Sequence, residues 1–281
     1  MPATTMTAPD PATVTGHTTE GKNDVLEVVG LSKSYGSGAK VTRAIERLDF
    51  TVEEHEFVGI VGPSGAGKTT LLKCIAGLLA PTDGQTLLRG VPVTAPPPEL
   101  AVVFQDYSRS LFPWLTVRRN VELPLRRKQE VADKGRVAAE ALGAVGLAGF
   151  EDHYPWQLSG GMQQRVAIAR ALAYQPRVLL MDEPFASVDA QTRAELEDLV
   201  LRVREQFGVT IVLVTHDIDE AVYMSDRVVV LSRPPSTVQE ILTVELPSPR
   251  DQVESKALPE FVSLRARVYE TIMQPAAKVA Q

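Results

Sequence analysis

The stretch FVGIVGPSGAGKTTLL, residues 57–72, decides the fold of this 281-residue chain. Its first five residues are apolar or glycine and predict a buried strand, and the residues from Lys68 to Leu79 predict a helix. Between them, residues 62–69 match the pattern G-x-x-x-x-G-K-[ST]. A strand, a glycine-rich loop and a helix in this order predict an α/β protein with a phosphate-binding loop.

The loop has the chemistry that the phosphates of a nucleotide require. Its glycines let backbone N–H groups turn toward an anion, and the helix N-terminus adds a partial positive charge. Lys68 can reach the outer phosphates, and the Thr69 hydroxyl can hold magnesium. The alternative is a glycine-rich turn that binds nothing. The expected nucleotide-binding residues are Gly62, Pro63, Ser64, Gly65, Ala66, Gly67, Lys68, Thr69 and Thr70.

A second predicted strand, VLLM at residues 178–181, ends in two acids, Asp182 and Glu183. Asp182 can hold magnesium through water, and Glu183 can polarise the water that attacks a γ-phosphate. The alternative is that these acids only begin a loop. In doubly wound sheets ligands bind at the carboxyl ends of the strands. Gly62, Asp182 and His216 each come just past a different predicted strand, so we expect them to meet at one edge.

His216 follows the predicted strand at residues 210–214 and precedes a helix. Alone, it could be a surface residue that caps this helix. Its expected position at the phosphate edge instead favours a donor that bonds the γ-phosphate and senses its loss.

The rest of the chain alternates short β-branched runs with helical patterns, which is typical of a parallel sheet with crossover helices. Past Arg233 the sequence becomes proline-rich and less periodic. The further elements that we expect are strands at residues 87–93 and 102–104, a helical stretch at 116–147, a helix with an apolar stripe at 196–207 and a C-terminal helix at 259–272.

Composition excludes several classes of protein. The net charge of −6 argues against a nucleic-acid partner, because phosphate backbones bind basic faces. The one cysteine, Cys74, fits a reducing compartment and a buried position. No apolar run approaches the ~18 residues of a membrane span. Residues 1–24 are rich in Thr, Pro and Ala and predict a disordered tail.

The segment LSGGMQQR, residues 158–165, is the most specific element of the sequence. Ser159, Gly160 and Gly161 precede a helical run that extends to Tyr174. They predict a second helix N-terminus that binds an anion, beyond an ordinary capping role for Ser159.

Residues 158–165 resemble the signature sequence of ATP-binding-cassette (ABC) proteins, beside matching Walker A and Walker B segments. The resemblance covers about residues 25–245 and implies an α/β fold: a P-loop NTPase core with a mostly parallel sheet, an antiparallel β subdomain and an inserted helical subdomain at about residues 106–175. Residues 246–281 would form a C-terminal helical extension. It also implies an ATPase with ATP and Mg²⁺ as cofactors. In this family the signature of one subunit faces the Walker A loop of another, so the chain would form a homodimer around ATP.

The resemblance assigns roles to further residues. Ser159 and Gly161 would contact the γ-phosphate held by Lys68 of the second copy. Gln105 matches the Q-loop glutamine that touches magnesium and the attacking water, so Thr69, Gln105 and Asp182 form the expected metal set. Tyr35 matches the aromatic residue that stacks on adenine. Asp189 matches the D-loop aspartate, although Asp is also an ordinary helix N-cap.

Within the family, the segments FPWLTV at 112–117, THDIDEAVY at 215–223, DRVVVLS at 226–232 and LRARV at 264–268 resemble the branch that imports nitrate, sulfonates, taurine and related compounds. This implies ATP-driven uptake of a small anion at the cytoplasmic face of the cell membrane, with the chain bound there peripherally. Membrane permease subunits and a separate solute-binding protein would be its partners. We expect the segment from Gln105 through Trp114 to dock a helix of the membrane partner. The alternative is that Phe112 and Trp114 pack the helical subdomain.

Other functions remain open to different degrees. A GTPase would need an N-K-x-D motif, which is missing, and a DNA-repair or translation cassette would need a coiled-coil insertion or tandem cassettes. A non-hydrolysing subunit would lack Glu183 or His216, and both are present. An ABC ATPase of another transporter class, or a cassette ATPase outside transport, remains the alternative.

Overall fold

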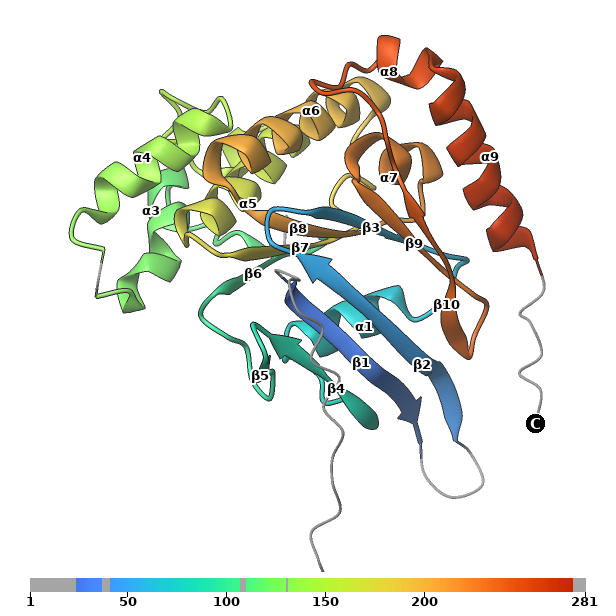
Figure 1. Ribbon diagram of the computed structural model, residues 1–281. Helices are drawn as coiled ribbons and strands as arrows, with labels where there is room; N and C mark the ends of the chain where they lie inside the picture. The colour runs from blue at the N-terminus through green and yellow to red at the C-terminus, as the bar shows by residue number, and fades with distance from the viewer. Residues whose placement is uncertain (1–23, 37–40, 107–109, 130, 275–281) are drawn as a thin grey trace, which may run out of the picture.

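The computed structural model describes residues 24–36, 41–106, 110–129 and 131–274 (Figure 1). The predicted N-terminal tail lies outside these ranges apart from Asp24, which begins the first strand. The described strands form one ten-stranded sheet in the order β5-β4-β1-β2-β10-β9-β3-β8-β7-β6. The α/β class that we expected from the sequence is confirmed.

Five neighbouring strands of this sheet are parallel and nearly all buried. Runs of Val, Leu and Ile cover both of their faces, as in sheets that helices pack on from both sides. Because these strands run the same way, their carboxyl ends meet at one edge. In sheet order they are β9 (Arg227–Leu231), β3 (Phe57–Val61), β8 (Thr210–Val214), β7 (Val178–Asp182) and β6 (Leu100–Val103).

The other half of the sheet is antiparallel. It contains β1 (Asp24–Tyr35), β2 (Thr42–Glu53), β4 (Asp83–Leu88) and β5 (Val91–Pro92). The single strand predicted at residues 87–93 was wrong, because Arg89 and Gly90 both have positive φ and turn the chain into the β4–β5 hairpin. The strand β10 (Ser236–Thr243) was missed; it pairs antiparallel with β9 and parallel with β2, and so joins the two halves.

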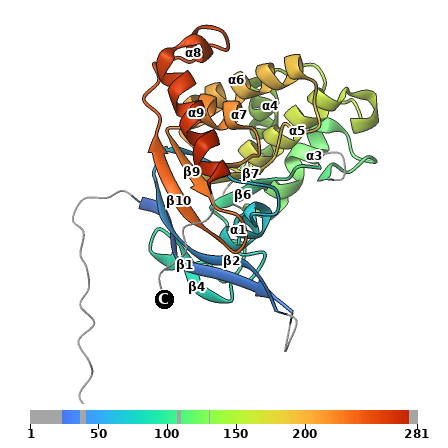
Figure 2. The ribbon, with the colours of Figure 1, turned by 90° about the vertical axis from the view of Figure 1, so that its right-hand side faces the viewer.

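Helices cover both faces of the parallel strands. Helix α1 (Lys68–Ile75) lies between them and the β1–β2–β4 layer, as the turned view makes clear (Figure 2). It is shorter than predicted, since Gly77 turns with a φ of 68°. The opposite face carries α5 (Gly160–Ala173), α6 (Ala190–Phe207), α7 (Ile218–Met224), α8 (Glu254–Ala257) and α9 (Pro259–Met273) (Figure 1).

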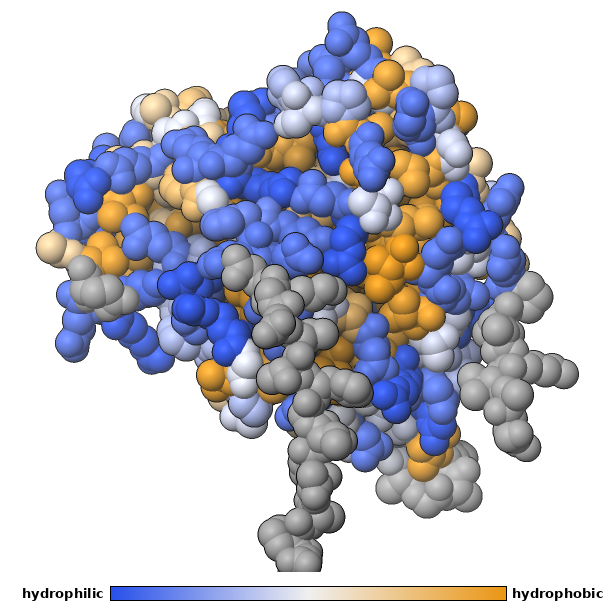
Figure 3. Space-filling view, viewed as in Figure 1, coloured by the Kyte–Doolittle hydropathy of each residue, from blue (hydrophilic) through white to orange (hydrophobic). Residues whose placement is uncertain are grey.

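A small helical region extends from one end of the sheet and packs on α5. It contains α3 (Val117–Glu122), the 3₁₀ turn Leu123–Arg127, α4 (Lys134–Ala144) and the 3₁₀ turn Pro155–Gln157 (Figure 1). The surface on the side seen in Figure 1 is largely hydrophilic, with hydrophobic residues gathered over β9 and β10 (Figure 3). Within the described residues, we found no helix with the length and apolar character needed to cross a membrane.

Candidate functional site

A pocket of ≈ 520 Å³ lies at the edge where β3, β7 and β8 end. Its lining comprises Ala44, residues 64–70, Glu183 and His216. Residues separated by more than 150 positions in sequence therefore share one cavity, as the strand-end argument predicted. Ala44, which enters from β2, had no sequence signal.

The glycine-rich loop curls over the start of α1 and aims its backbone into this pocket. Gly65 and Gly67 have φ values of 79° and 75°, a region that glycine adopts without strain. Lys68 is buried, and its Nζ donates to the carbonyl oxygens of Gly62 (2.8 Å) and Pro63 (3.3 Å). Desolvation by burial lowers the pKa of Lys68, and the charges of Glu183 and Asp182 oppose that shift. Both of these carbonyl oxygens are neutral, so the ammonium can exchange them for phosphate oxygens.

The two acids at the end of β7 occupy different environments. Asp182 is buried, which raises the pKa of its carboxyl, and its Oδ1 accepts a hydrogen bond from Thr69 Oγ1 at 3.1 Å. Glu183 has a φ of 45°, yet its N–H still donates to the Val214 carbonyl oxygen at 2.8 Å, which continues the pairing of β7 with β8. This geometry turns the Glu183 side chain out of the sheet and toward the pocket.

Two predicted partners converge on the Glu183 carboxylate. Gln105 Nε2 donates to Glu183 Oε2 at 3.2 Å, and His216 Nδ1 lies 3.2 Å from the same oxygen. They follow β6 and β8, the strands on either side of β7. The arrangement is an acid held by two donors above the phosphate loop, which is suited to orient a water molecule for attack.

Tyr35 lies beside the same loop. Its hydroxyl is 3.1 Å from Thr70 Oγ1, and its ring is 44% exposed. An exposed ring at this position is available to stack on a base.

The signature residues lie elsewhere on the chain and do not line the pocket. Ser159 caps α5, and its Oγ accepts from Met162 N at 3.3 Å. Asp189 caps α6 and accepts from both the N–H (3.0 Å) and the hydroxyl (2.7 Å) of Thr192. A Cβ on Gly161 would lie 2.4 Å from Thr192 Cγ2, so the signature helix and the start of α6 pack closely.

Two residues next to the pocket were missed by sequence reasoning. Arg193 and Glu220 share a small cavity with Glu183 and His216. Glu220 stands within the segment at 215–223 that carries the family resemblance, and that position was its only signal.

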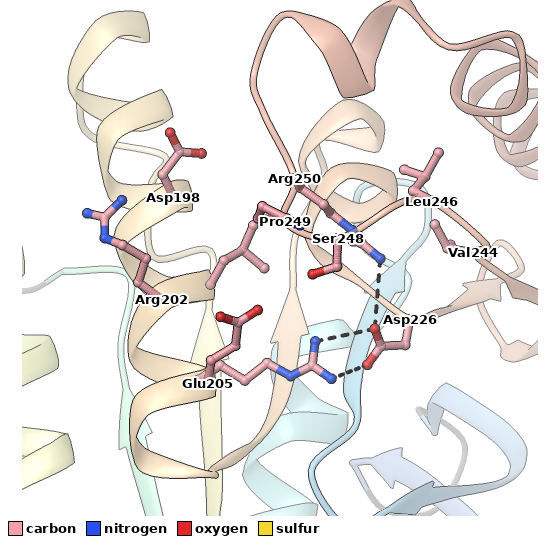
Figure 4. Close-up of a pocket in the computed structure, with 11 residues that line it drawn as sticks. Asp198, Arg202, Glu205, Asp226, Val244, Leu246, Ser248, Pro249 and Arg250 are labelled. Carbon is pink, nitrogen blue, oxygen red and sulfur yellow. Dashed lines mark hydrogen bonds and ion pairs between the residues drawn. The ribbon is translucent and has the colours of Figure 1, made fainter.

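A second cavity, of ≈ 320 Å³, lies at the opposite edge of the parallel sheet between α6, the start of β9 and residues 244–250 (Figure 4). Two of its arginines point at one carboxylate there. Arg204 bonds both oxygens of Asp226, and Arg250 Nη2 lies 3.8 Å from Asp226 Oδ1. Asp226 also accepts from Phe57 N at 2.9 Å, so this ion cluster braces the starts of β3 and β9.

The family model described as ABC transporter matches residues 45–186, just over half of the chain, including the phosphate loop, Gln105, the signature and both acids. The chain belongs to the ABC transporter family. It is an ATP-binding subunit of a transporter and an ATPase, as the sequence resemblance implied.

Several relatives of this ABC ATPase are known over nearly its full length. An uncharacterized ABC transporter ATP-binding protein of Methanocaldococcus jannaschii is 44% identical over 90% of this chain and 93% of its own. The aliphatic sulfonates import ATP-binding protein of Bacillus cereus is 42% identical over 87% and 94%. The bicarbonate transport ATP-binding protein of Synechococcus elongatus is 45% identical over 86% of this chain, which matches 37% of that longer protein.

Solved structures agree with the fold. A dimeric ATP-binding cassette in a post-hydrolysis state, bound to ADP and Pi, superposes with a TM-score of 0.69 at 34% identity. The match covers 78% of this chain and 99% of that one.

Proposed function

We propose that this ABC ATPase energises the import of a small anion, and that the residues of the 520 Å³ pocket hydrolyse its ATP. The observation that carries the hydrolytic assignment is the contact of Gln105 and His216 with one oxygen of Glu183. Glu183 takes a proton from the attacking water as that water bonds to the γ-phosphorus. The bond between the γ-phosphorus and the bridging oxygen of ADP then breaks and gives ADP and Pi.

The remaining pocket residues bind and orient the nucleotide in this proposal. The backbone N–H groups of residues 64–69, at the start of α1, bind the phosphates, and Lys68 moves from its two carbonyl acceptors to the outer phosphate oxygens. Tyr35 stacks on adenine. His216 bonds the γ-phosphate and registers its departure.

The oxygen atoms beside the phosphate loop fit Mg²⁺ as ligands. Thr69 Oγ1 and Asp182 Oδ1 lie 3.1 Å apart, and oxygen ligands are those that Mg²⁺ prefers. Within the described ranges, no group of three or more His, Cys, Asp and Glu side chains is placed to hold a metal ion. A site with few protein ligands suits Mg²⁺, which in ATPases takes phosphates and water as further ligands. Thr69, Asp182 and Gln105 would hold it, and it would neutralise charge on the β- and γ-phosphates.

We propose a homodimer in which Ser159, Gly160, Gly161 and Asp189 of one copy complete the pocket of the other. The support is their separation from Lys68 within one chain, together with the helix N-terminus that α5 presents behind Ser159. Backbone N–H groups at such a terminus bind anions.

The membrane partner of the proposal is a permease that binds the segment from Gln105 through Trp114, at the cytoplasmic face of the membrane. Residues 107–109 of this segment lie outside the described residues. Asn120 is fully buried and fixes the segment's end: its Oδ1 accepts from Phe112 N, and its Nδ2 donates to three carbonyl oxygens of residues 112–116. The Trp114 side chain is left 70% exposed, with Phe112 packed edge-on at 5.4 Å between ring centroids. An exposed aromatic pair on a backbone anchored by Asn120 suits docking better than core packing.

Alanine at both Phe112 and Trp114 tests this docking in cells that contain the complete transporter. The variant should fold and bind ATP as the wild type does, because both rings are exposed, while co-purification with the permease weakens and solute uptake falls. Normal uptake with the permease fully bound would rule the docking surface out.

The solute is proposed from the relatives alone: aliphatic sulfonates for one and bicarbonate for another are both small anions. Nitrate and taurine belong to the same proposal. A solute-binding protein would deliver the anion. Uptake of labelled sulfonate, taurine, nitrate and bicarbonate, with and without the gene for this subunit, tests the proposal. The proposal would be overturned if deletion of the gene left the uptake of all four anions unchanged and abolished the uptake of another class of solute.

A further inference from the structure

A buried glutamate holds the loop that carries His216. Glu220, in the first turn of α7, is 4% exposed. Its Oε2 accepts a hydrogen bond from the hydroxyl of Thr215, and that hydroxyl oxygen in turn accepts from Asp217 N at 3.0 Å. Thr215 and Asp217 flank His216, so the two bonds close a turn around it.

The same turn is fastened on its other sides. Thr215 N donates to the Ile60 carbonyl oxygen of β3 at 3.1 Å, and Asp217 Oδ1 accepts from Glu220 N at 3.2 Å. Asp217 Oδ2 lies 3.2 Å from Arg193 Nη1, which reaches across from α6. By contrast the His216 ring is 61% exposed, and its contact with Glu183 depends on where its backbone is held.

We propose that Glu220 is a positioning residue for ATP hydrolysis: through the Thr215 hydroxyl it fixes the backbone that presents His216 to Glu183 and to the γ-phosphate. The inference rests on the role proposed for His216. It assigns Glu220 no contact with ATP, so its loss should slow hydrolysis without weakening nucleotide binding.

Charge at this position agrees with such a role. Burial, helped by the nearby acids Glu197 and Asp217, raises the pKa of Glu220 to about 8, against the lowering effect of the Thr215 hydrogen bond and Arg193. The side chain is therefore mostly uncharged at neutral pH. A neutral amide of the same shape should serve in its place.

Glu197 provides a matched control. It is equally buried, at 3% exposed, but it lies on α6 and its partners are Gln252 Nε2 at 3.0 Å and Lys256 Nζ at 3.4 Å. These contacts tie α6 to the C-terminal segment and not to the His216 loop. Loss of any buried carboxyl would affect both variants, whereas only Glu220 bonds the Thr215 hydroxyl beside His216.

The test compares kcat, KM and ATP affinity of the full-length chain with those of single variants. Glu220→Ala and Thr215→Val should each lower kcat by roughly 10–100-fold, since displacement of a catalytic group by about 1 Å has that effect. ATP affinity should stay within about twofold, because neither residue touches the nucleotide in the proposal. Glu220→Gln should keep kcat within a few-fold of the wild-type value, and Glu197→Gln should leave kcat unchanged.

Two further variants separate the possible failures. The double variant Glu220→Ala with Thr215→Val should be no slower than either single one, since both act through one hydrogen bond. If His216→Ala hydrolyses ATP normally, the proposed role of His216 is wrong. If His216→Ala is inactive while Thr215→Val and Glu220→Ala keep the wild-type kcat, only the positioning role is wrong. Should Glu220→Ala fail to fold, Thr215→Val, a change of one hydroxyl, decides the matter alone.

Discussion

The two edges of the parallel sheet both carry charged side chains around a cavity, but they pair those charges differently. At the carboxyl edge, Lys68 donates to carbonyl oxygens, and Glu183 is contacted by Gln105 and His216. At the opposite edge, Arg204 and Arg250 converge on the carboxylate of Asp226 (Figure 4).

The difference shows which cavity is prepared for a ligand. Charges that are paired within the chain stabilise the fold and gain little from an incoming ion. A buried ammonium that bonds neutral acceptors can exchange them for phosphate oxygens at little cost.

The largest effect is expected for Glu183→Gln. The amide keeps the shape and the contacts of the side chain but cannot accept a proton, and loss of a general base lowers the rate by ~10²–10⁴-fold. ATP should still bind. Turnover near that of the wild type, measured with the assembled transporter, would show that Glu183 is not the base.

At the opposite edge, Asp226→Ala should act on stability. It leaves the mostly buried Arg204 and Arg250 without their carboxylate, which should lower the free energy of unfolding by about 2–4 kcal/mol. Denaturant unfolding measures this loss, and calorimetry should give an unchanged ATP affinity. If the variant kept its stability and bound ATP more weakly, the view that this edge stabilises the fold and the other binds the ligand would be wrong.

Glu220→Gln tests a buried acid near the phosphate edge through the pH dependence of the free energy of unfolding. The folded-state pKa of about 8 lies above the ordinary value of 4.5, so the folded wild type retains a proton that the unfolded chain releases. Wild-type stability should therefore fall as the pH rises from about 4.5 to 8, by up to about 3 kcal/mol at pH 7. The Gln variant has no proton to release at this position, so its stability lacks this dependence on pH. The free energy of unfolding of the variant, relative to that of the wild type, should therefore rise over the same pH range. Parallel curves for the two proteins would show that burial does not shift this carboxyl.

The smallest effect is expected for Tyr35→Ala, which should weaken ATP binding by about 1–3 kcal/mol if the ring stacks on adenine. Tyr35→Phe is the matched control, since it keeps the ring and loses only the contact with Thr70. Calorimetry should find Phe close to the wild type and Ala weaker. Equal affinities for all three proteins would exclude stacking.

Local pattern predicted some elements to the residue. The strands β3 and β8 have the bounds that we expected, because each is a short run of apolar and β-branched residues that ends at glycine or a polar residue. The strand β10 was missed because its residues are polar or half-buried, and it forms by pairing with two distant strands. The only sequence signal for the break at Arg89 was the following Gly90, since an arginine with a φ of 51° is uncommon.

In the candidate site too, some features could be predicted from the sequence and others could not. The meeting of the phosphate loop, Glu183 and His216 could be predicted, because parallel strands align their carboxyl ends. The contact of Glu220 with Thr215, and that of Arg193 with Asp217, could not, because they depend on how α6 and α7 pack on the sheet. The positive φ of Glu183 is likewise a product of its hydrogen bond to β8.

The place of β10 in the sheet also has a consequence for how the chain is made. The strand β2 ends at Glu53, but Ser236 and Thr237 of β10, which pair with it, come more than 180 residues later, so the ribosome must add these residues before the two strands can pair. At synthesis rates of about 5–20 residues per second, that interval lasts roughly 10–40 s. Throughout it, one edge of β2 remains open to pairing with other chains. Chaperones that bind nascent chains should therefore protect this edge of β2 until β10 has been made.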